Sequence, residues 1–335
     1  MNNLKYSFII PVYNRPDEID ELLHSFLGLE GDIPFEIVIV EDGSSIDCKT
    51  VIDKYTSNLD ISYYYKANSG PGDSRNYGMK KAKGNYFIIL DSDCLLPKSY
   101  LVSVSEFLST NLVDCYGGPD AAHASFSDLQ KAINFSMTSF ITTGGIRGGK
   151  DSTSFQPRSF NMGLSKKAFE HSGGFGTIHP GEDPDLSIRL NRLGYKTVLI
   201  QNAYVYHKRR ISWNKFYQQV YKFGLVRPIL NKWHPQTKKL TYWFPTFFIL
   251  GLVIAFVLFL LNFKYGLYLY AVYFILAFIM ALIQTKNIKV AFQSLYAICI
   301  QFYGYGSGFL KSTVAINMLN KDPELHFPKL FFKNV

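Results

Sequence analysis

Two long apolar stretches without a charge limit most strongly what this chain can fold into. They run from Phe244 to Leu261 and from Tyr265 to Ile283, and only Asn262, Phe263 and Lys264 separate them. A helix that crosses the hydrocarbon core of a bilayer needs ~17 to 25 mostly apolar residues. A helix of a soluble domain would normally carry a polar stripe. We therefore expect a membrane hairpin (244–261, 265–283) that follows a large N-terminal domain.

A third apolar stretch covers residues 290–309 and also lacks a charge. Glutamine, serine and glycine residues dilute it, so the pattern fits a spanning helix, a re-entrant helix or an interfacial helix. We assign 241–310 to the membrane region with this third helix left open, and 311–335 to a C-terminal tail.

The chain carries 35 Lys and Arg against 26 Asp and Glu, and the excess lies in one segment, 208–240, which has no acidic residue. Its aromatic and basic residues favour a helix lying on an anionic leaflet. Basic residues flank the hairpin on both sides, which indicates a plasma membrane protein with a cytoplasmic catalytic domain. Nucleic acid binding would not explain the adjacent apolar stretches, so we expect no nucleic acid partner. The basic residues are Lys208, Arg209, Arg210, Lys215, Lys222, Arg227, Lys232, Lys238 and Lys239.

The first two hundred residues alternate short β-rich runs with helical patterns. The runs Tyr6–Val12 and Phe35–Glu41 enclose a segment with apolar residues on one helical face, and the pattern recurs over 61–90. This predicts an α/β, Rossmann-like fold with a mostly parallel sheet and helices on both faces. Such sheets bind ligands at the carboxyl ends of their strands.

Polar side chains follow each of these predicted strands. Asp91 and Asp93 lie in an Asp-Ser-Asp turn directly after the run 86–90. Turn formation and helix capping explain most such residues singly. Asp91 and Asp93 together indicate a site for Mn²⁺ or Mg²⁺, because hard oxygen ligands suit a cation that bridges carboxylates to a diphosphate.

Several motifs occur together in a fixed order. They are Ser7-Phe8-Ile9-Ile10-Pro11-Val12-Tyr13-Asn14, Glu36-Ile37-Val38-Ile39-Val40-Glu41-Asp42-Gly43-Ser44, Asn68-Ser69-Gly70-Pro71-Gly72-Asp73-Ser74-Arg75-Asn76-Tyr77-Gly78 and Leu90-Asp91-Ser92-Asp93. In this order the chain resembles family 2 glycosyltransferases of the GT-A fold over about residues 7–207. The resemblance implies a catalytic domain over 1–207 that binds a nucleotide-diphosphate sugar.

The resemblance also implies roles for single residues. Asp42 would contact the nucleotide base, and Asp91 and Asp93 would bind the metal. Arg75 pairs with a phosphate or braces an acidic neighbour, and both roles stay open. Ser74 departs from the family, which more often has Ala there. The expected donor-binding residues are Pro11, Tyr13, Asn14, Asp42, Arg75 and Ser92.

The acceptor side is expected at Gly181-Glu182-Asp183-Pro184-Asp185-Leu186, which reads as an acidic helix start. Plain helix capping explains it equally well from composition. By the resemblance, Asp183 is the general base of an inverting transfer and Glu182 supports it. His207 matches a position where the family often has a metal-ligating His, although a packing role is an equal alternative.

The resemblance thus implies an inverting, metal-dependent transferase that moves a sugar to a lipid-linked or cell-surface glycan. A polyprenyl-phosphate sugar synthase and a processive polysaccharide synthase share the fold and stay open. A nucleotidyltransferase is disfavoured because Pro11–Pro16 is not a glycine-rich phosphate loop. An inactive sugar-nucleotide-binding scaffold is disfavoured, because it would be expected to lack the acidic residues of the site. All five are present: Asp42, Asp91, Asp93, Glu182 and Asp183. We further expect an acceptor loop within 119–156, which includes Gly144–Gly149.

Overall fold

The computed structural model describes residues 4–121, 126–144, 155–207 and 212–332. The chain divides into two compact units. The first contains 1–123, 150–208 and 331–335, and the second contains 124–149 and 209–330. Three of the predicted basic residues, Lys208, Arg209 and Arg210, lie outside the described residues. Residues 145–154, in the stretch where the acceptor loop is expected, do so too.

The first unit is built on a seven-stranded sheet in the order β3-β2-β1-β4-β8-β6-β9. Within it only β8 runs antiparallel to its neighbours, so the sheet is mostly parallel, as predicted. The sequence did not predict β8, which inserts between β4 and β6. The strands are β1 (Tyr6–Val12), β2 (Phe35–Asp42), β3 (Ile61–Lys66), β4 (Tyr86–Leu90), β6 (Cys115–Gly117), β8 (Asn161–Ser165) and β9 (Thr197–Leu199).

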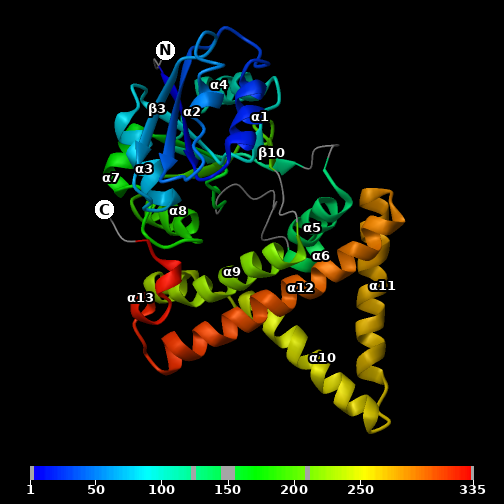
Figure 1. Cartoon of the computed structure of the whole chain (residues 1–335). Helices are drawn as coiled ribbons and strands as arrows, with labels where there is room; N and C mark the ends of the chain where they lie inside the picture. Colours follow the sequence, from blue (N-terminus) through cyan, green and yellow to red (C-terminus); the bar gives the residue numbers. More distant parts are fainter. Residues whose placement is uncertain (1–3, 122–125, 145–154, 208–211, 333–335) are drawn as a thin grey trace. The chain divides into compact units, whose positions relative to one another are not determined.

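Helices cover both faces of this sheet (Figure 1). Successive side chains of a strand point to opposite faces, so Phe8 and Ile10 pack with α1 (Pro16–Phe26), α2 (Lys49–Ile52) and α4 (Tyr100–Thr110). Ile9 packs on the other face, with α3 (Pro71–Lys81), α7 (Lys166–Ser172) and α8 (Glu182–Arg192). The predicted α/β class with helices on both faces is confirmed.

A smaller sheet lies beside the carboxyl end of β4. It consists of β5 (Cys94–Leu95), β10 (Val205–His207) and β7 (Asp120–Ala121), with β10 in the centre. In the antiparallel β10–β5 pair, His207 is opposite Cys94. This pairing places His207 next to the Asp-Ser-Asp turn at 91–93.

The second unit is helical, and α9 and α12 run side by side in it (Figure 1). Glycines permit this close approach, because a Cβ on Gly224 would lie only 2.2 Å from the carbonyl oxygen of Tyr305. The third apolar stretch forms one continuous helix, α12. The helices are α5 (Asp128–Thr138), α6 (Phe140–Thr143), α9 (Trp213–Trp233), α10 (Phe244–Leu260), α11 (Tyr265–Thr285), α12 (Ile288–Thr313) and α13 (Pro323–His326), with short turns Pro235–Thr237, Leu240–Trp243, Val314–Met318 and Pro328–Leu330.

Part of the stretch 119–156, in which an acceptor loop is expected, is helical. Ser127 caps α5 by accepting a hydrogen bond from the backbone N–H of Gln130, whose side chain accepts one from the Ser127 N–H. This Ser-x-x-Gln capping box was a signal in the sequence. The described part of 119–156 thus contains β7, α5 and α6, and the acceptor loop stays a prediction.

Two helical segments of the described chain are long and apolar enough to cross a membrane, Leu240–Leu260 and Tyr265–Thr285. They contain α10 and α11 and cover nearly all of the two apolar stretches of the sequence, while the membrane hairpin stays a prediction. Most of their large apolar side chains are exposed, including Phe256 and Ile275. α12 is not among these candidates. Many of its residues are buried against the other helices.

Candidate active site

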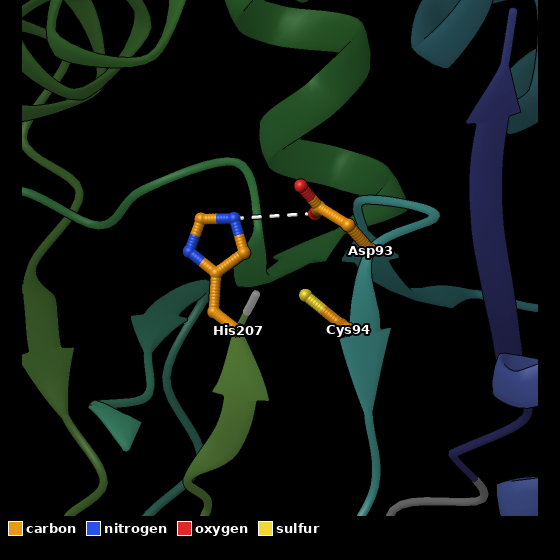
Figure 2. Close-up of side chains that lie close together, drawn as sticks. All are labelled: Asp93, Cys94 and His207. Carbon is orange, nitrogen blue, oxygen red and sulfur yellow. Dashed lines mark ion pairs between the residues drawn. The ribbon is translucent and has the colours of Figure 1, made fainter. Parts of the chain in front are cut away.

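Asp93 and His207 meet at the junction of the two sheets (Figure 2). The Nε2 atom of His207 lies 3.2 Å from Oδ1 of Asp93. The other ring nitrogen, Nδ1, lies 4.0 Å from Oδ2 of Asp120, and the ring stacks on Phe160 at 4.6 Å. Ring stacking and two carboxylates thus fix the orientation of the imidazole.

This cluster fits a divalent cation. One potential ligand atom from each of Asp93, Cys94 and His207 lies within 4.8 Å of the others. Burial, with Asp93 and Asp91 adding to it, raises the pKa of the Cys94 thiol well above its ordinary value. A soft sulfur ligand also suits Mn²⁺ or Mg²⁺ poorly. A carboxylate oxygen and an imidazole nitrogen remain, a set that suits Mn²⁺ or Mg²⁺.

Asp91, the other predicted metal ligand, is held by Arg75. Nη2 of Arg75 donates to Oδ1 of Asp91 at 2.6 Å, and Nη1 donates to Oε1 of Glu182 at 3.0 Å. The Arg75 residue is only 3% exposed, and its guanidinium also lies 5.3 Å from the centre of the Phe175 ring. One arginine of α3 thereby joins the end of β4 to the start of α8. In these contacts Arg75 braces acidic neighbours.

Glu182 opens α8 and is buried. Besides Arg75 it contacts Nδ1 of His179 at 3.0 Å, while its Oε2 atom has no hydrogen-bond partner among the described residues. Burial acts to raise the pKa of Glu182, but His179 and Arg75 outweigh it and lower the pKa to about 2. Glu182 is therefore an anion that is paired on one oxygen only.

Asp183 follows on the same helix turn, and its Oδ2 lies 3.5 Å from Nη1 of Arg158. Burial raises the pKa of Asp183 above its ordinary value; the Glu182 charge adds to the rise, and Arg158 offsets only part of it. The pKa of Glu182 is thus lowered, whereas the pKa of the neighbouring Asp183 is raised. A raised pKa makes Asp183 the better proton acceptor of the two.

Asp42, the predicted base-binding residue, ends β2 and is buried. Its carboxylate accepts hydrogen bonds from Nζ of Lys66 at 2.8 Å and from the backbone N–H groups of Ser69 and Gly70, each at 2.9 Å. These bonds shape the turn that leads into α3. Gly70 needs its glycine there, since its φ is +94°.

The predicted donor-side residues after β1 differ in exposure. Pro11 is buried within β1, whereas Tyr13 is 53% exposed. Asn14, at φ 53°, accepts hydrogen bonds from the backbone N–H groups of Ser45 and Ile46. The Asn14 side chain thus connects the β1–α1 turn to the segment that follows β2.

Two further residues of the predicted site have local partners. The hydroxyl of Ser92 donates to Oε2 of Glu18 at 3.0 Å. Ser74, which stands where the family more often has Ala, is fully buried, and its hydroxyl has no partner among the described residues.

Sequence reasoning missed two residues of this site. His179 lies three positions before Glu182, a spacing that was visible in the sequence. Arg158 carried no such signal, because only the fold brings it to Asp183.

Residues 7–173 match the family model of glycosyl transferase family 2. An uncharacterised glycosyltransferase of Rickettsia conorii is 38% identical over 111 residues, 33% of this chain and 18% of that protein. The poly(ribitol-phosphate) β-N-acetylglucosaminyltransferase TarS of Staphylococcus aureus is 34% identical over 116 residues, 33% of this chain and 20% of TarS. The chain thus spans about a fifth of the length of these relatives.

Among solved structures, a mannosyltransferase of Pyrobaculum calidifontis, in complex with GDP-mannose and Mn²⁺, has a TM-score of 0.58 with 15% sequence identity. The similarity covers 95% of this chain and 88% of that one and shows the same fold. By the family-model match, residues 7–173 belong to glycosyltransferase family 2. The solved structure adds that the fold is the same.

Proposed function

We propose that this protein is an inverting, metal-dependent glycosyltransferase, which moves a sugar from a nucleotide-diphosphate donor to a lipid-linked or cell-surface glycan. The observation that carries the proposal is the arrangement around Arg75. This side chain joins Asp91, at the metal side of the site, to Glu182, next to Asp183. In this proposal, Arg75 would connect the metal-binding residues to the proton-accepting residues.

The donor half would consist of Asp93, His207 and the oxygen of Asp91 that Arg75 leaves free. A bound Mn²⁺ or Mg²⁺ would offset the negative charge that develops on the departing nucleoside diphosphate. Tyr13, exposed next to the strand ends, offers a ring face to the base. Asp42 stays the predicted base contact and already shapes the turn around it.

The acceptor half would use Asp183 as the general base. The acceptor hydroxyl passes its proton to the Asp183 carboxylate while its oxygen forms a bond to the anomeric carbon. The bond from that carbon to the β-phosphate oxygen breaks, and the nucleoside diphosphate leaves. Burial raises the pKa of Asp183, and the charge of Glu182, which Arg75 and His179 hold as an anion, adds to the rise.

The apolar helices favour attachment to a membrane. Exposed rings and aliphatic chains along α10 and α11 form larger apolar surfaces than a soluble protein normally leaves in water. The basic residues around them favour a cytoplasmic catalytic unit at the plasma membrane, near anionic lipids. Cysteine introduced at Asn262, between the helices, should react with an impermeant maleimide only from the outside of intact cells. Labelling from the cytoplasmic side would contradict this orientation.

Calorimetric binding of UDP-, GDP- and dTDP-sugars to the detergent-solubilised protein tests the function, each with Mn²⁺ and with a chelator. We expect one donor to bind only with the metal, and Asp93→Ala to weaken that binding about 10-fold or more. Asp183→Asn should bind the donor normally and lower transfer by on the order of 10²-fold to 10⁴-fold.

The matched control is Asp32→Ala, because Asp32 is an exposed carboxylate on the turn before β2. This variant should behave like the wild-type protein in both assays. Metal-independent binding of every donor, or loss of donor binding in Asp183→Asn, would refute the assigned roles.

A further inference from the structure

Two residues far along the chain, Phe331 and Phe332, belong to the first unit, which contains the candidate active site and is called the catalytic unit below. They follow the last turn of the helical unit, Pro328–Leu330, yet they group with the residues of the first unit. Neither has a counterpart in the motifs of the sequence, which end near residue 207. Their contacts fall on segments that lead directly into the candidate active site.

Phe331 and Phe332 pair with the segment before α8 like a short strand. Phe331 forms an antiparallel bridge with Ile178, and the N–H of Phe332 donates to the carbonyl oxygen of Thr177 at 3.0 Å. Ile178 is buried. The backbone of this segment is thereby fixed at its middle.

The ring of Phe332 packs between the two sides of the site. A Cβ built on Gly70 would lie 2.3 Å from Cγ of Phe332, so the ring rests on the glycine. The centre of the ring also lies 6.0 Å from that of His179. Phe332 thus contacts the turn whose N–H group binds Asp42 and also the histidine that binds Glu182.

The segment from Gly174 to Gly181 has its other fixed points at its ends. At its start, the Asn76 side chain accepts from the Phe175 N–H at 2.8 Å and donates to the Phe175 carbonyl at 2.9 Å. At its far end, Arg75 holds Glu182. Between these points, the contacts to Phe331 and Phe332 hold residues 177–179.

We propose that Phe331 and Phe332 are positioning residues for the transfer reaction. They hold the segment 177–181 so that His179 and Glu182 keep the geometry that supports Asp183 as the base. The inference rests on the proposed transferase function for its kinetic readout only. Its structural part, the immobilisation of the segment, is measured without any substrate.

The experiment compares the full-length wild-type protein with Phe332→Ala and Phe332→Leu. Leu keeps apolar bulk against Gly70, whereas Ala leaves the space empty. Leu325→Ala is the control, because Leu325 is an 85% exposed apolar residue of α13 in the same part of the chain. Phe332→Pro removes the ring and also the N–H that donates to Thr177, so its difference from Phe332→Ala tests the backbone contact.

Hydrogen–deuterium exchange of peptides covering 174–183 is the first readout, in the absence of donor. Phe332→Ala and Phe332→Pro should increase exchange about 10-fold at 177–181, with Phe332→Leu closer to the wild-type protein and Leu325→Ala unchanged. Unchanged exchange in both Phe332→Ala and Phe332→Pro overturns the proposal.

Steady-state turnover is the second readout, with the donor identified by calorimetry. Phe332→Ala should lower kcat about 10-fold and leave the donor KM within twofold, and Phe332→Leu should restore most of kcat. Faster exchange without a change in kcat, or an increased KM at unchanged kcat, overturns the positioning role. If the wild-type protein turns over no donor, the proposed function fails while the exchange result still decides whether the segment is held.

Discussion

Arg75 offers the sharpest test of the site, because one side chain neutralises two carboxylates. Arg75→Met keeps the length and apolar volume of the side chain and removes its charge. Glu182 would then keep only His179, and Asp91 would lose its partner at 2.6 Å. The variant should fold less stably and should lose the link between the metal side and the acceptor side.

The magnitude follows from burial. Removing one partner of a buried ion pair typically costs about 3 to 5 kcal/mol, since the other charge stays buried without compensation. Glu182 is buried and its pKa lies at about 2, below its ordinary 4.5, through His179 and Arg75 against the effect of burial. A lowered carboxylate pKa stabilises the fold above pH 4.5 and loses that effect as the pH falls toward 2. We therefore expect Arg75→Met to lose about 3 kcal/mol at pH 7.

The assay has to report on the catalytic unit. All three tryptophans, Trp213, Trp233 and Trp243, lie in the helical unit, so intrinsic fluorescence does not follow it. Three cysteines of the catalytic unit are buried: Cys48, Cys94 and Cys115. Their labelling by a maleimide in increasing urea, read by mass spectrometry of the peptides, measures unfolding. Cys299 is exposed in the folded protein and serves as the labelling control.

A second substitution separates charge from packing. In Arg75→Met combined with Glu182→Gln, the uncompensated anion is gone, so the loss should be smaller than the sum of the single losses by about 1 to 3 kcal/mol. A loss below about 1 kcal/mol in Arg75→Met, or strict additivity in the double variant, would refute the bridging role.

Four further predictions concern single residues. Ser74→Ala should be neutral or should stabilise the protein by about 1 kcal/mol in the same unfolding assay, because it removes a buried hydroxyl without a partner; a loss of more than 1 kcal/mol would contradict this. The raised pKa of Asp183 predicts that kcat/KM falls on the acid side with an apparent pKa above the ordinary 3.8, as the base becomes protonated. Arg158→Met should move that limb to higher pH, and a pH profile identical to that of the wild-type protein would exclude the contact. Asn14→Gly keeps the positive φ but removes the bonds to Ser45 and Ile46, so donor Kd should rise about 3-fold to 10-fold by calorimetry while Asp32→Ala leaves it unchanged.

Local sequence patterns predicted the first half of the sheet well. The runs Tyr6–Val12 and Tyr86–Leu90 form strands with those bounds, and the acidic turn Glu182–Asp183 begins a helix. These elements follow from local alternation and from helix-start signals. The short strand β8 was not predicted, because Asn161–Ser165 contains a Gly and carries no clear alternation. Its partners, β4 and β6, supply the pairing that makes it a strand.

The amino-acid sequence by itself determined which chemical groups the site contains. Acidic residues follow β2 and β4, an arginine lies in α3 and two carboxylates open α8, and these positions follow from period and capping alone. The apolar helices were likewise set by composition, since an uninterrupted run of apolar residues admits few other structures.

Only the tertiary structure decided which of these groups meet. Arg75 pairs with Asp91 and with Glu182, which is 107 positions away. Asp93, directly before β5, pairs with His207 of β10. Phe332 packs against Gly70, although the two residues are far apart in the sequence. Such contacts depend on how strands order and how helices pack, and these depend on the summed burial of the whole core. The pKa values of Glu182 and Asp183 diverge for the same reason, because burial and neighbouring charges exist only once the chain has folded.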